Sequence, residues 1–293
     1  SLWLDRPAIP MTPVETQDVE NFGGEPRADK VAWLRRWMLL NDVDQVFLSS
    51  LDEIAWLLNV RASDIDYNPL VISYLLVSQD YVKWFVKKEN TQMDPDTEDS
   101  FSELVADGVE VEDYDAVYFA LKDFSGENSA VKLFVDPSTL NYHLYTHIKE
   151  AYPEDCLVTG TSPVILEKAV KTASEIENLR QTYIDDGVAM ECFLHWLEME
   201  VAARGGVSEW EASERLTAFR SEIPGYRGNS FENISAYGPD AALPHYSTPQ
   251  HGSAIIRPSG LYLVDSGGQY LTGTTDITRT VPMGECTMLE KED

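Results

Sequence analysis

The sequence predicts an α/β domain followed by an α+β domain. In residues 45–86, short apolar runs typical of strands alternate with a helix that begins at a capping motif, which is the pattern of an α/β unit. After residue 163, two helical stretches come first and several strand-like segments follow, which favours helices packed against an antiparallel sheet. The short polar break Thr161-Ser162-Pro163 separates the two patterns, so we expect one domain over residues 1–162 and a second over residues 163–293.

The first domain is expected to begin with an extended arm, because residues 1–27 lack apolar periodicity and contain four prolines. Ser50 and Glu53 form a capping box, in which the serine hydroxyl accepts a hydrogen bond from a first-turn amide while the glutamate reaches back to the serine amide. The expected helices are 30–40, 50–61, 101–106, 115–121 and 142–150; the expected strands are 45–49, 71–77, 81–86, 109–111, 131–135 and 156–158; and a polar surface loop is expected at 87–100.

The helices of the second domain are also expected to begin at capping boxes. Ser174–Glu177 starts a long helix that runs to about Arg204, where Gly205-Gly206 supplies a left-handed residue that ends it. Ser208–Glu211 starts a second helix that runs to about Arg220. The strands expected after these helices are near 232–236, 252–256 and 260–264, followed by a hairpin over 263–281.

The composition is that of a globular, acidic protein. The 293 residues are 43% hydrophobic and 25% charged, and the formal net charge is 22 − 50 = −28. Because such a surface repels phosphate backbones and anionic lipid headgroups, nucleic-acid and membrane partners are not expected. The three cysteines have no CxxC spacing, no apolar run approaches transmembrane length and no signal peptide is visible, so we expect reduced thiols in a cytoplasmic protein.

Residues 263–281, LVDSGGQYLTGTTDITRTV, carry the candidate metal site. Two strand-like runs flank a glycine-rich turn, which predicts a β-hairpin. The runs contain Asp265 and Asp276 in apolar surroundings, and a buried carboxylate is costly unless it is paired or bound to a cation. Two carboxylates on one hairpin suit divalent metal ions, which prefer oxygen ligands. The alternative is that both aspartates are solvated turn residues.

This stretch resembles the first metal-binding motif of the Xaa-Pro aminopeptidases (aminopeptidase P), a family of pita-bread metallopeptidases. The resemblance implies that Asp265 and Asp276 hold part of a centre of two divalent metal ions, usually manganese, with zinc or cobalt as alternatives. The family often has an aspartate where this chain has Thr272, but that position is not a ligand in the family. The remaining family ligands, one histidine and two glutamates, lie beyond the hairpin, and this chain has no histidine after His251.

His245 is the candidate catalytic residue. On the residues alone, a histidine after a proline is more often structural, but His245-Tyr246 resembles the His-Tyr block that precedes the metal hairpin in this family. The resemblance implies that His245 donates a hydrogen bond to the substrate or to the developing tetrahedral intermediate, a role suited to an imidazole. We expect the other histidines to be structural, surface or turn residues, with a minor substrate-binding role left open for the last of them: His143, His147, His195 and His251.

A second block of the chain carries the same resemblance. Residues 51–61, LDEIAWLLNVR, together with Asn68-Pro69, are similar to the middle domain of long, three-domain aminopeptidases P. On the residues alone, this block is a capped core helix. The resemblance implies a creatinase-like N-terminal-type α/β domain, the first part of an α+β pita-bread catalytic domain after it, and a position for Arg61 that faces the substrate.

The activity implied by the resemblance is that of a metal-dependent aminopeptidase. It releases the N-terminal residue from peptides with proline in the second position, through a hydroxide that bridges the two metals. A homodimer is also implied. Because the chain lacks the downstream ligands, we expect a fragment that binds metal weakly and is inactive alone. Two alternatives stay open: a prolidase-like enzyme that cleaves only Xaa-Pro dipeptides, and a non-catalytic peptide-binding relative on the same fold.

Overall fold

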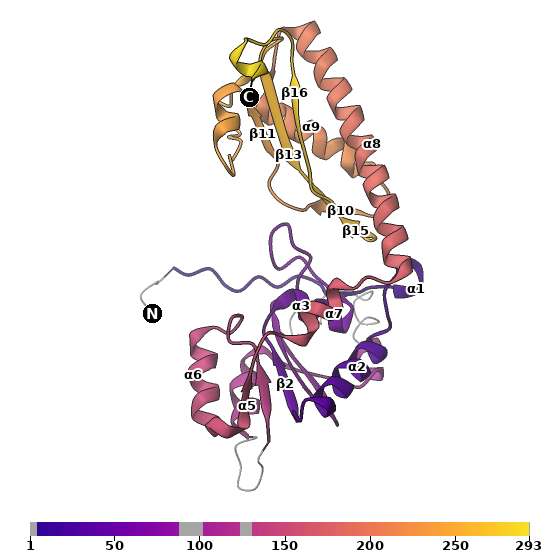
Figure 1. The fold of residues 1–293 in the computed structure, drawn as a ribbon, viewed down its shortest axis with the longest axis vertical. Helices are drawn as coiled ribbons and strands as arrows, with labels where there is room; N and C mark the ends of the chain where they lie inside the picture. Colours follow the sequence, from indigo (N-terminus) through magenta and orange to yellow (C-terminus); the bar gives the residue numbers. More distant parts are fainter. Residues whose placement is uncertain (1–4, 88–101, 124–130, 293) are drawn as a thin grey trace. The chain divides into compact units, whose positions relative to one another are not determined.

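The computed structural model describes residues 5–87, 102–123 and 131–292, which form two compact units (Figure 1). Unit 1 covers Ser1–Thr172 and unit 2 covers Ala173–Asp293. Each unit has its own hydrophobic core, and the predicted order of an α/β fold followed by an α+β fold is confirmed. The expected surface loop falls, from residue 88 to 100, outside the described residues.

A six-stranded mixed sheet organises unit 1. Its strand order is β6-β5-β4-β2-β7-β8, with parallel pairs at both ends and antiparallel pairing of β4 with both β2 and β5 in the centre. The antiparallel pair β4 and β5 is the hairpin expected from the sequence. The strands are β2 (Gln45–Leu48), β4 (Ser73–Ser78), β5 (Val82–Val86), β6 (Val109–Asp113), β7 (Leu133–Val135) and β8 (Leu157–Thr159).

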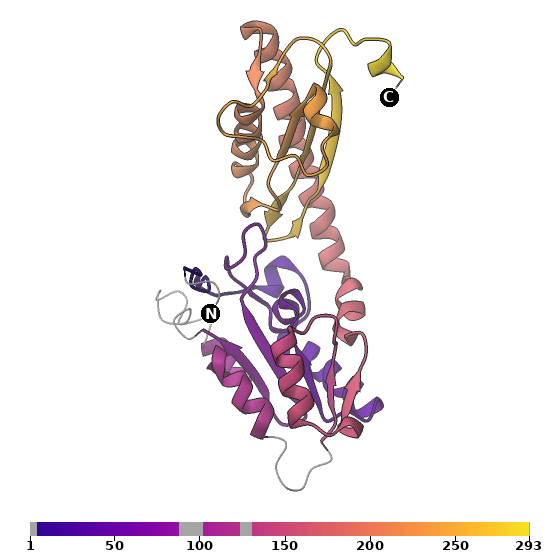
Figure 2. The same ribbon diagram turned by 90° about the vertical axis from the view of Figure 1, so that its left-hand side faces the viewer.

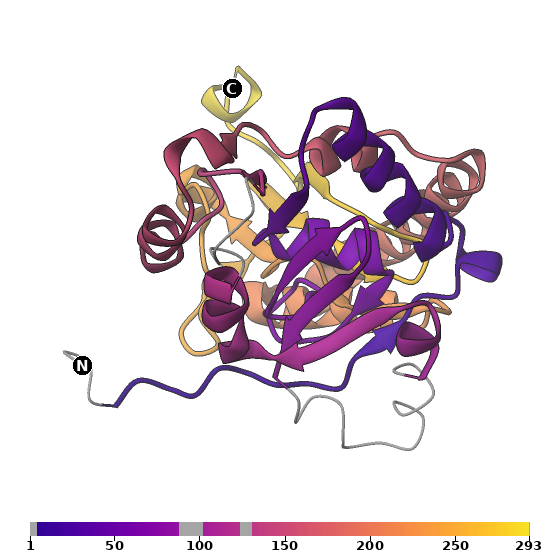
Figure 3. The same cartoon turned by 90° about the horizontal axis from the view of Figure 1, so that it is seen from below.

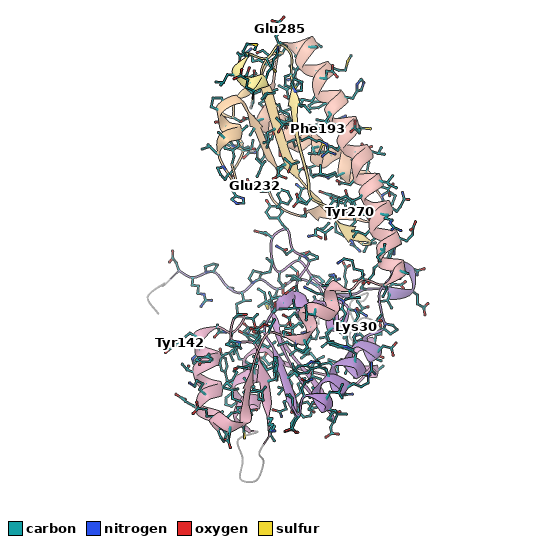
Figure 4. All side chains as sticks on the ribbon, viewed as in Figure 1. Lys30, Tyr142, Phe193, Glu232, Tyr270 and Glu285 are labelled. Atoms are coloured by element: carbon teal, nitrogen blue, oxygen red, sulfur yellow. The ribbon has the colours of Figure 1, made fainter. Side chains whose placement is uncertain are left out.

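Different helices cover the two faces of this sheet (Figure 2, Figure 3). Neighbouring residues of a strand point to opposite faces, so Val46 and Leu48 of β2 enter the core under α2 and α3, while Phe47 enters the core under α5 and α6. Tyr142, at the start of α6, points to solvent (Figure 4). The helices are α2 (Arg27–Leu40), α3 (Leu51–Leu58), α5 (Val117–Asp123) and α6 (Tyr142–Ala151), with one-turn helices η2 (Tyr114–Ala116) and η3 (Glu154–Cys156) and a helical stretch at 102–106.

The described part of the N-terminal arm is only partly extended. It contains a two-residue strand, β1 (Glu15–Thr16), which pairs with β3 (Val60–Arg61), and a one-turn helix, α1 (Val19–Phe22). The amide and the hydroxyl of Thr12 both donate to Asp64 Oδ1 at 2.8 Å. Asp64 is buried, so these bonds satisfy its carboxylate and hold the arm on the unit.

The capping box predicted at Ser50 is wrong. The Ser50 hydroxyl makes no capping bond to α3 and donates instead to Asp52 Oδ1 at 2.6 Å. Glu53 is buried and accepts a hydrogen bond from the Ser162 hydroxyl, and burial raises the pKa of its carboxyl group. The Glu53 carboxylate therefore bonds to Ser162, which is distant in sequence, and not to the Ser50 amide at the start of the helix, as the local pattern predicts.

The segment after β8 belongs to unit 1. Ser162 caps α7 (Pro163–Ala169), and its amide donates to the buried Asp136 at 2.9 Å. Helix α7 packs against α3, so the compact unit extends to Thr172. The boundary expected after Ser162 falls before this helix.

Unit 2 places two helices on antiparallel strands. Helices α8 (Ala173–Arg204) and α9 (Glu209–Ser221) share a core with the three-stranded sheet β11-β13-β16 (Figure 1). A second sheet has the order β10-β14-β15, and β9 pairs with β12. The strands are β9 (Val207–Ser208), β10 (Tyr226–Asn229), β11 (Ile234–Tyr237), β12 (Ile255–Ile256), β13 (Leu261–Ser266), β14 (Gly268–Tyr270), β15 (Gly273–Thr274) and β16 (Ile277–Pro282), with one-turn helices η4 (Gly238–Ala242) and η5 (Leu289–Lys291).

The core of unit 2 lies between its helices and the sheet. Phe193 of α8 is fully buried and contacts Tyr262 of β13, with ring centroids 6.5 Å apart (Figure 4). Leu263, the next residue of β13, is only half-buried, so the sheet packs on the helices with one face and has a more open second face. In the parts of the chain that the structure describes, none of the helices has the length and apolar character needed to cross a membrane.

The helix ends of unit 2 follow the predicted signals in part. Helix α8 begins one residue before Ser174, which therefore lies in the first turn and is not the N-cap. The Ser208 hydroxyl caps α9 by accepting a hydrogen bond from the Glu211 amide at 3.1 Å, but the Glu211 carboxylate pairs with Arg204. Gly205 has φ +74° and ends α8, as expected.

Candidate metal centre

The predicted hairpin forms, with an extension at its tip. Strands β13 and β16 pair in antiparallel register, and Asp265 lies opposite Thr278. Between them, β14 and β15 form a smaller hairpin that pairs with β10 in a different sheet. The turn expected between the two aspartates is therefore itself a pair of short strands.

The register places both aspartates on the same face of the sheet. Along β13, Tyr262 and Ser266 are buried on the helix side, whereas Asp265 lies on the more open face. Asp276 lies directly before β16, two residues before Thr278, the direct partner of Asp265. The alternation of burial continues through it, because Thr275 is buried and Ile277 half-buried, whereas Asp276 and Thr278 are exposed. Asp265 and Asp276 are therefore diagonal neighbours across the hairpin.

The burial of the two aspartates differs from the expectation. Asp276 is exposed and Asp265 is half-buried, so neither carboxylate is enclosed by apolar side chains. The expectation of two buried carboxylates is wrong, because the face that carries them is the open face of the sheet. The Thr278 hydroxyl donates to Asp265 Oδ1 at 2.8 Å, which orients this carboxylate. The hairpin thus presents two carboxylates to one side of the sheet, and a hydrogen bond orients the one of Asp265.

The chain passes very close to itself at Gly267, between the two aspartates. A Cβ atom at this position would lie 2.0 Å from the Thr275 carbonyl oxygen and 2.2 Å from Ser230 Oγ. The Ser230 hydroxyl donates to the same carbonyl at 2.9 Å, and the Gly268 amide donates to Thr275 Oγ1 at 2.9 Å. Because Thr275 directly precedes Asp276, these contacts set the position of the second aspartate.

Gly267→Ala is expected to destabilise unit 2 by about 3 kcal/mol, since backbone and not a flexible side chain occupies the space that the methyl group needs. Urea unfolding of this variant and of the wild-type chain measures the change in the free energy of unfolding. The matched control is Gly187→Ala within α8, where an added Cβ meets no atom within 4 Å and the helix gains about 0.5–1 kcal/mol. Equal stability of the two variants would contradict the close approach at Gly267.

A buried ion pair supports the tip of the hairpin. Arg220 of α9 and Asp186 of α8 have no solvent exposure, and Arg220 Nε lies 2.7 Å from Asp186 Oδ1. Tyr270 of β14 donates to the same oxygen at 2.5 Å; burial, and then the neighbouring carboxylate, raise the pKa of this phenol (Figure 4). The hydroxyl oxygens of Thr182 in α8 and Thr272 lie 2.7 Å apart. These contacts fix the tip to both helices.

His245 lies in the loop between β11 and β12. It is exposed, and its φ of +54° is a left-handed conformation that residues other than glycine seldom adopt. The loop turns back along β11, where Thr248 Oγ1 donates to the Ser235 carbonyl at 3.0 Å and accepts from the Ser235 amide at 3.1 Å. Because the adjacent Ile234 pairs with Asp265, the loop returns to the end of the sheet that carries the aspartates.

Arg61 lies in unit 1. Its Nη1 donates to the carbonyl of Ala55 at 3.2 Å and to that of Val60 at 2.8 Å, so the guanidinium satisfies carbonyls at the end of α3. Desolvation lowers its pKa. These bonds are local, and a contact of Arg61 with substrate stays a prediction.

The remaining histidines have local surroundings. His147 Nε2 lies 2.7 Å from the Tyr118 carbonyl oxygen, and the rings of His143 and His147 both contact the Tyr118 ring. His195 is exposed on α8, and His251 is exposed in a turn. Within residues 5–87, 102–123 and 131–292, no group of three or more His, Cys, Asp or Glu side chains could hold a metal ion. Asp265 and Asp276 therefore stay two candidate ligands, with no third candidate beside them among these described residues.

Sequence reasoning missed three buried charged residues of unit 2, Asp186, Glu209 and Arg220, of which the first and last support the hairpin tip. A signal was present in the spacing of α9, where Glu209, Ala212, Leu216 and Arg220 recur at intervals of three and four residues and are all buried. A charged residue on the apolar face of a helix is buried only if it is paired, so this spacing predicts a buried partner for Glu209 and for Arg220.

Family models match nearly the whole chain. Residues 5–175 match the Creatinase/Prolidase N-terminal domain, and residues 177–292 match Metallopeptidase family M24. The first model covers more than half of the chain, so the chain belongs to the family of proteins with a Creatinase/Prolidase N-terminal domain. The change from one match to the other falls close to the division of the structure after Thr172.

Curated relatives of the chain bear the name Xaa-Pro aminopeptidase. A probable Xaa-Pro aminopeptidase P from Laccaria bicolor is 35% identical over 98% of this chain and 43% of the relative. Xaa-Pro aminopeptidase 2 from Rattus norvegicus is 38% identical over 98% of this chain and 42% of the relative. The chain thus spans less than half the length of these relatives.

Solved structures show the same likeness. X-prolyl aminopeptidase from Caenorhabditis elegans, described as a cytosolic enzyme with a di-nuclear active site, has a TM-score of 0.89 at 32% identity, covering 98% of this chain and 46% of that one. An Xaa-Pro dipeptidase from Bacillus anthracis has a TM-score of 0.66 at 24% identity, covering 91% of this chain and 68% of that one, and this likeness extends to the fold alone.

Proposed function

We propose that this chain is part of an Xaa-Pro aminopeptidase, which releases the N-terminal residue from peptides with proline in the second position. One observation carries the proposal: the register of β13 and β16 brings Asp265 and Asp276 to one open face, in a chain that aligns over 98% of its length with Xaa-Pro aminopeptidases. The alignment supports the substrate class, and the paired carboxylates support metal-assisted hydrolysis.

Two divalent metal ions fit the donors on this face. Manganese is the first choice, with zinc or cobalt as alternatives, because oxygen ligands on an open face suit hard cations. Asp265 would hold one ion and Asp276 would contact both. When bound, such ions polarise a carbonyl group and make water more acidic. Two carboxylates do not complete this centre, so we expect further ligands from sequence outside the described residues, as the greater length of the relatives allows.

His245 and Arg61 would act on the peptide. An imidazole on the loop that returns to the aspartate end can donate a hydrogen bond to the carbonyl oxygen of the residue before proline, where negative charge develops during attack. Arg61 would bind the peptide after release from its local carbonyl partners, or through a partner subunit in a homodimer. A cytoplasmic location is part of the proposal, supported by the cytosolic description of the nematode neighbour.

The test uses the longer protein that contains this chain, loaded with manganese, and three peptides: a tripeptide with proline in second position, the same peptide with alanine there, and the corresponding Xaa-Pro dipeptide. We expect cleavage of the proline tripeptide in preference to the other two. Preference for the dipeptide would identify a prolidase, and binding without cleavage would identify a non-catalytic relative.

A second measurement concerns the 293-residue chain alone. With only two of the ligands, it is expected to bind manganese weakly in isothermal titration and to leave the proline tripeptide uncut. Tight binding of two ions, or turnover by this chain, would contradict the need for further ligands.

A further inference from the structure

Glu209 is a buried carboxylate with no part in the proposed function so far. It is the first residue of α9, directly after the N-cap Ser208, and it has no solvent exposure. Its amide donates to the Ala254 carbonyl at 3.0 Å, and its carbonyl accepts from the Ser235 hydroxyl at 2.8 Å. A carboxylate at such a position is costly unless hydrogen-bond donors surround it.

Three donors surround this carboxylate, and each comes from a different part of one loop. The Tyr237 amide donates to Oε1 at 2.7 Å, while the Tyr246 hydroxyl and the Ala254 amide donate to Oε2 at 2.9 and 3.1 Å. Tyr237 ends β11, and Ala254 lies directly before β12. Tyr246 directly follows His245. One carboxylate therefore holds the beginning, the middle and the end of loop 238–254.

The chemistry of the three partners requires an acceptor with two oxygens. All three groups donate, and hydrogen bonds to an ionised acceptor are stronger than those between neutral groups. Burial raises the pKa of Glu209, and hydrogen bonds from these donors oppose the rise. A glutamine would turn its NH2 group toward at least one of the donors, so a bond would be replaced by the contact of two donors. Glu209 therefore cannot be replaced by its amide without releasing part of the loop.

The conformation of His245 depends on how this loop is held. A residue other than glycine at φ +54° is strained by about 1 kcal/mol or more, and such strain persists only where the surroundings enforce it. A separate set of contacts holds the loop after this point: Ser247 donates to Glu232 at 2.9 Å, and Thr248 bonds to Ser235. The bond from Tyr246 to Glu209 holds the residue next to the imidazole.

We propose that Glu209 is the positioning residue for His245, acting through Tyr246 and the two ends of the loop. This inference rests on the proposed function, in which His245 donates to the substrate. Glu209 itself contacts neither substrate nor metal ligand. Because a misplacement of about 1 Å at a reacting centre can lower the rate about 100-fold, loosening this loop lowers kcat more than it raises KM.

The experiment compares Glu209→Gln with Glu211→Gln in the longer, metal-loaded protein. Glu211 lies two residues further along the same helix and pairs with Arg204 at the surface, so it controls for loss of a carboxylate in α9. We expect Glu209→Gln to lower kcat for the proline tripeptide about 10- to 100-fold with a small change in KM, and to speed amide hydrogen exchange in 238–254. Glu211→Gln leaves both unchanged.

A second variant keeps the proposal testable if Glu209→Gln fails to fold. Tyr246→Phe removes the middle bond to Glu209 together with the longer bond from the same hydroxyl to Asp240 Oδ2 at 3.4 Å, so kcat falls by a smaller factor while the Tyr237 and Ala254 amides stay protected from exchange. Unchanged kcat in either folded variant, or equal effects of Glu209→Gln and Glu211→Gln, would overturn the positioning role. If the wild-type protein does not cleave Xaa-Pro peptides, the proposed function fails, and hydrogen exchange still decides whether Glu209 holds the loop.

Discussion

Replacing Asp265 or Asp276 by asparagine is expected to lower kcat/KM for a proline tripeptide by about 1,000-fold or more in the metal-loaded longer protein. A neutral amide oxygen is a weaker ligand than a carboxylate, and metal ions contribute several kcal/mol to transition-state stabilisation. Each 1.36 kcal/mol corresponds to a factor of about ten in rate. Steady-state kinetics measure the loss of activity, and the metal content per chain of the same preparations measures the loss of metal binding.

Thr278→Val is the matched control for these two variants. It removes the 2.8 Å hydrogen bond to Asp265 and keeps the carboxylate, so the ligand is present but less well oriented. We expect a loss of about 10- to 100-fold, with smaller loss of metal, as is usual for residues that orient metal ligands. Asparagine variants that retain full metal content and wild-type turnover would show that this face of the hairpin does not bind the metals.

Arg220→Met is expected to lower the free energy of unfolding by about 3–5 kcal/mol. The change leaves Asp186 buried without its cation, while Tyr270 continues to donate to the same carboxylate. Because Tyr270 belongs to β14, the loss also loosens the tip between the two aspartates. Equilibrium unfolding in urea, followed by tryptophan fluorescence, measures the effect.

Arg215→Met provides the comparison within the same helix. Arg215 is exposed and lies over the rings of Trp196 and Phe219, with its guanidinium carbon 4.5 Å from the Phe219 centroid, so its loss should cost about 1 kcal/mol or less. A double variant, Asp186→Leu with Arg220→Met, should recover much of the stability because no charge then stays unpaired. Equal losses for Arg215→Met and Arg220→Met would show that the buried pair does not stabilise the unit.

The sequence correctly predicted those elements whose signals lie within a few consecutive residues. The short apolar run that forms β2 and the glycine that ends α8 are visible in short windows of sequence. The capping box at Ser50 failed because Glu53 bonds to Ser162, more than a hundred residues away in sequence. Local patterns cannot reveal which distant donor a carboxylate finds.

The motif made Asp265 and Asp276 candidate ligands, but it did not contain their geometry. The face on which Asp265 lies depends on its pairing with Thr278. Between β13 and β16, the strands β14 and β15 pair with β10 in a second sheet. This long-range pairing cannot be predicted from the glycines of the turn. The open setting of both carboxylates was missed because apolar neighbours in sequence point to the other face of the strand.

Anomalous diffraction at the manganese absorption edge, on crystals of the longer protein, tests the central claim most directly. We expect two peaks about 3.5–4 Å apart on the open face of β13 and β16, both in contact with Asp276 and one in contact with Asp265. Manganese bound elsewhere in the molecule, with neither aspartate among its ligands, would contradict a metal centre at this hairpin.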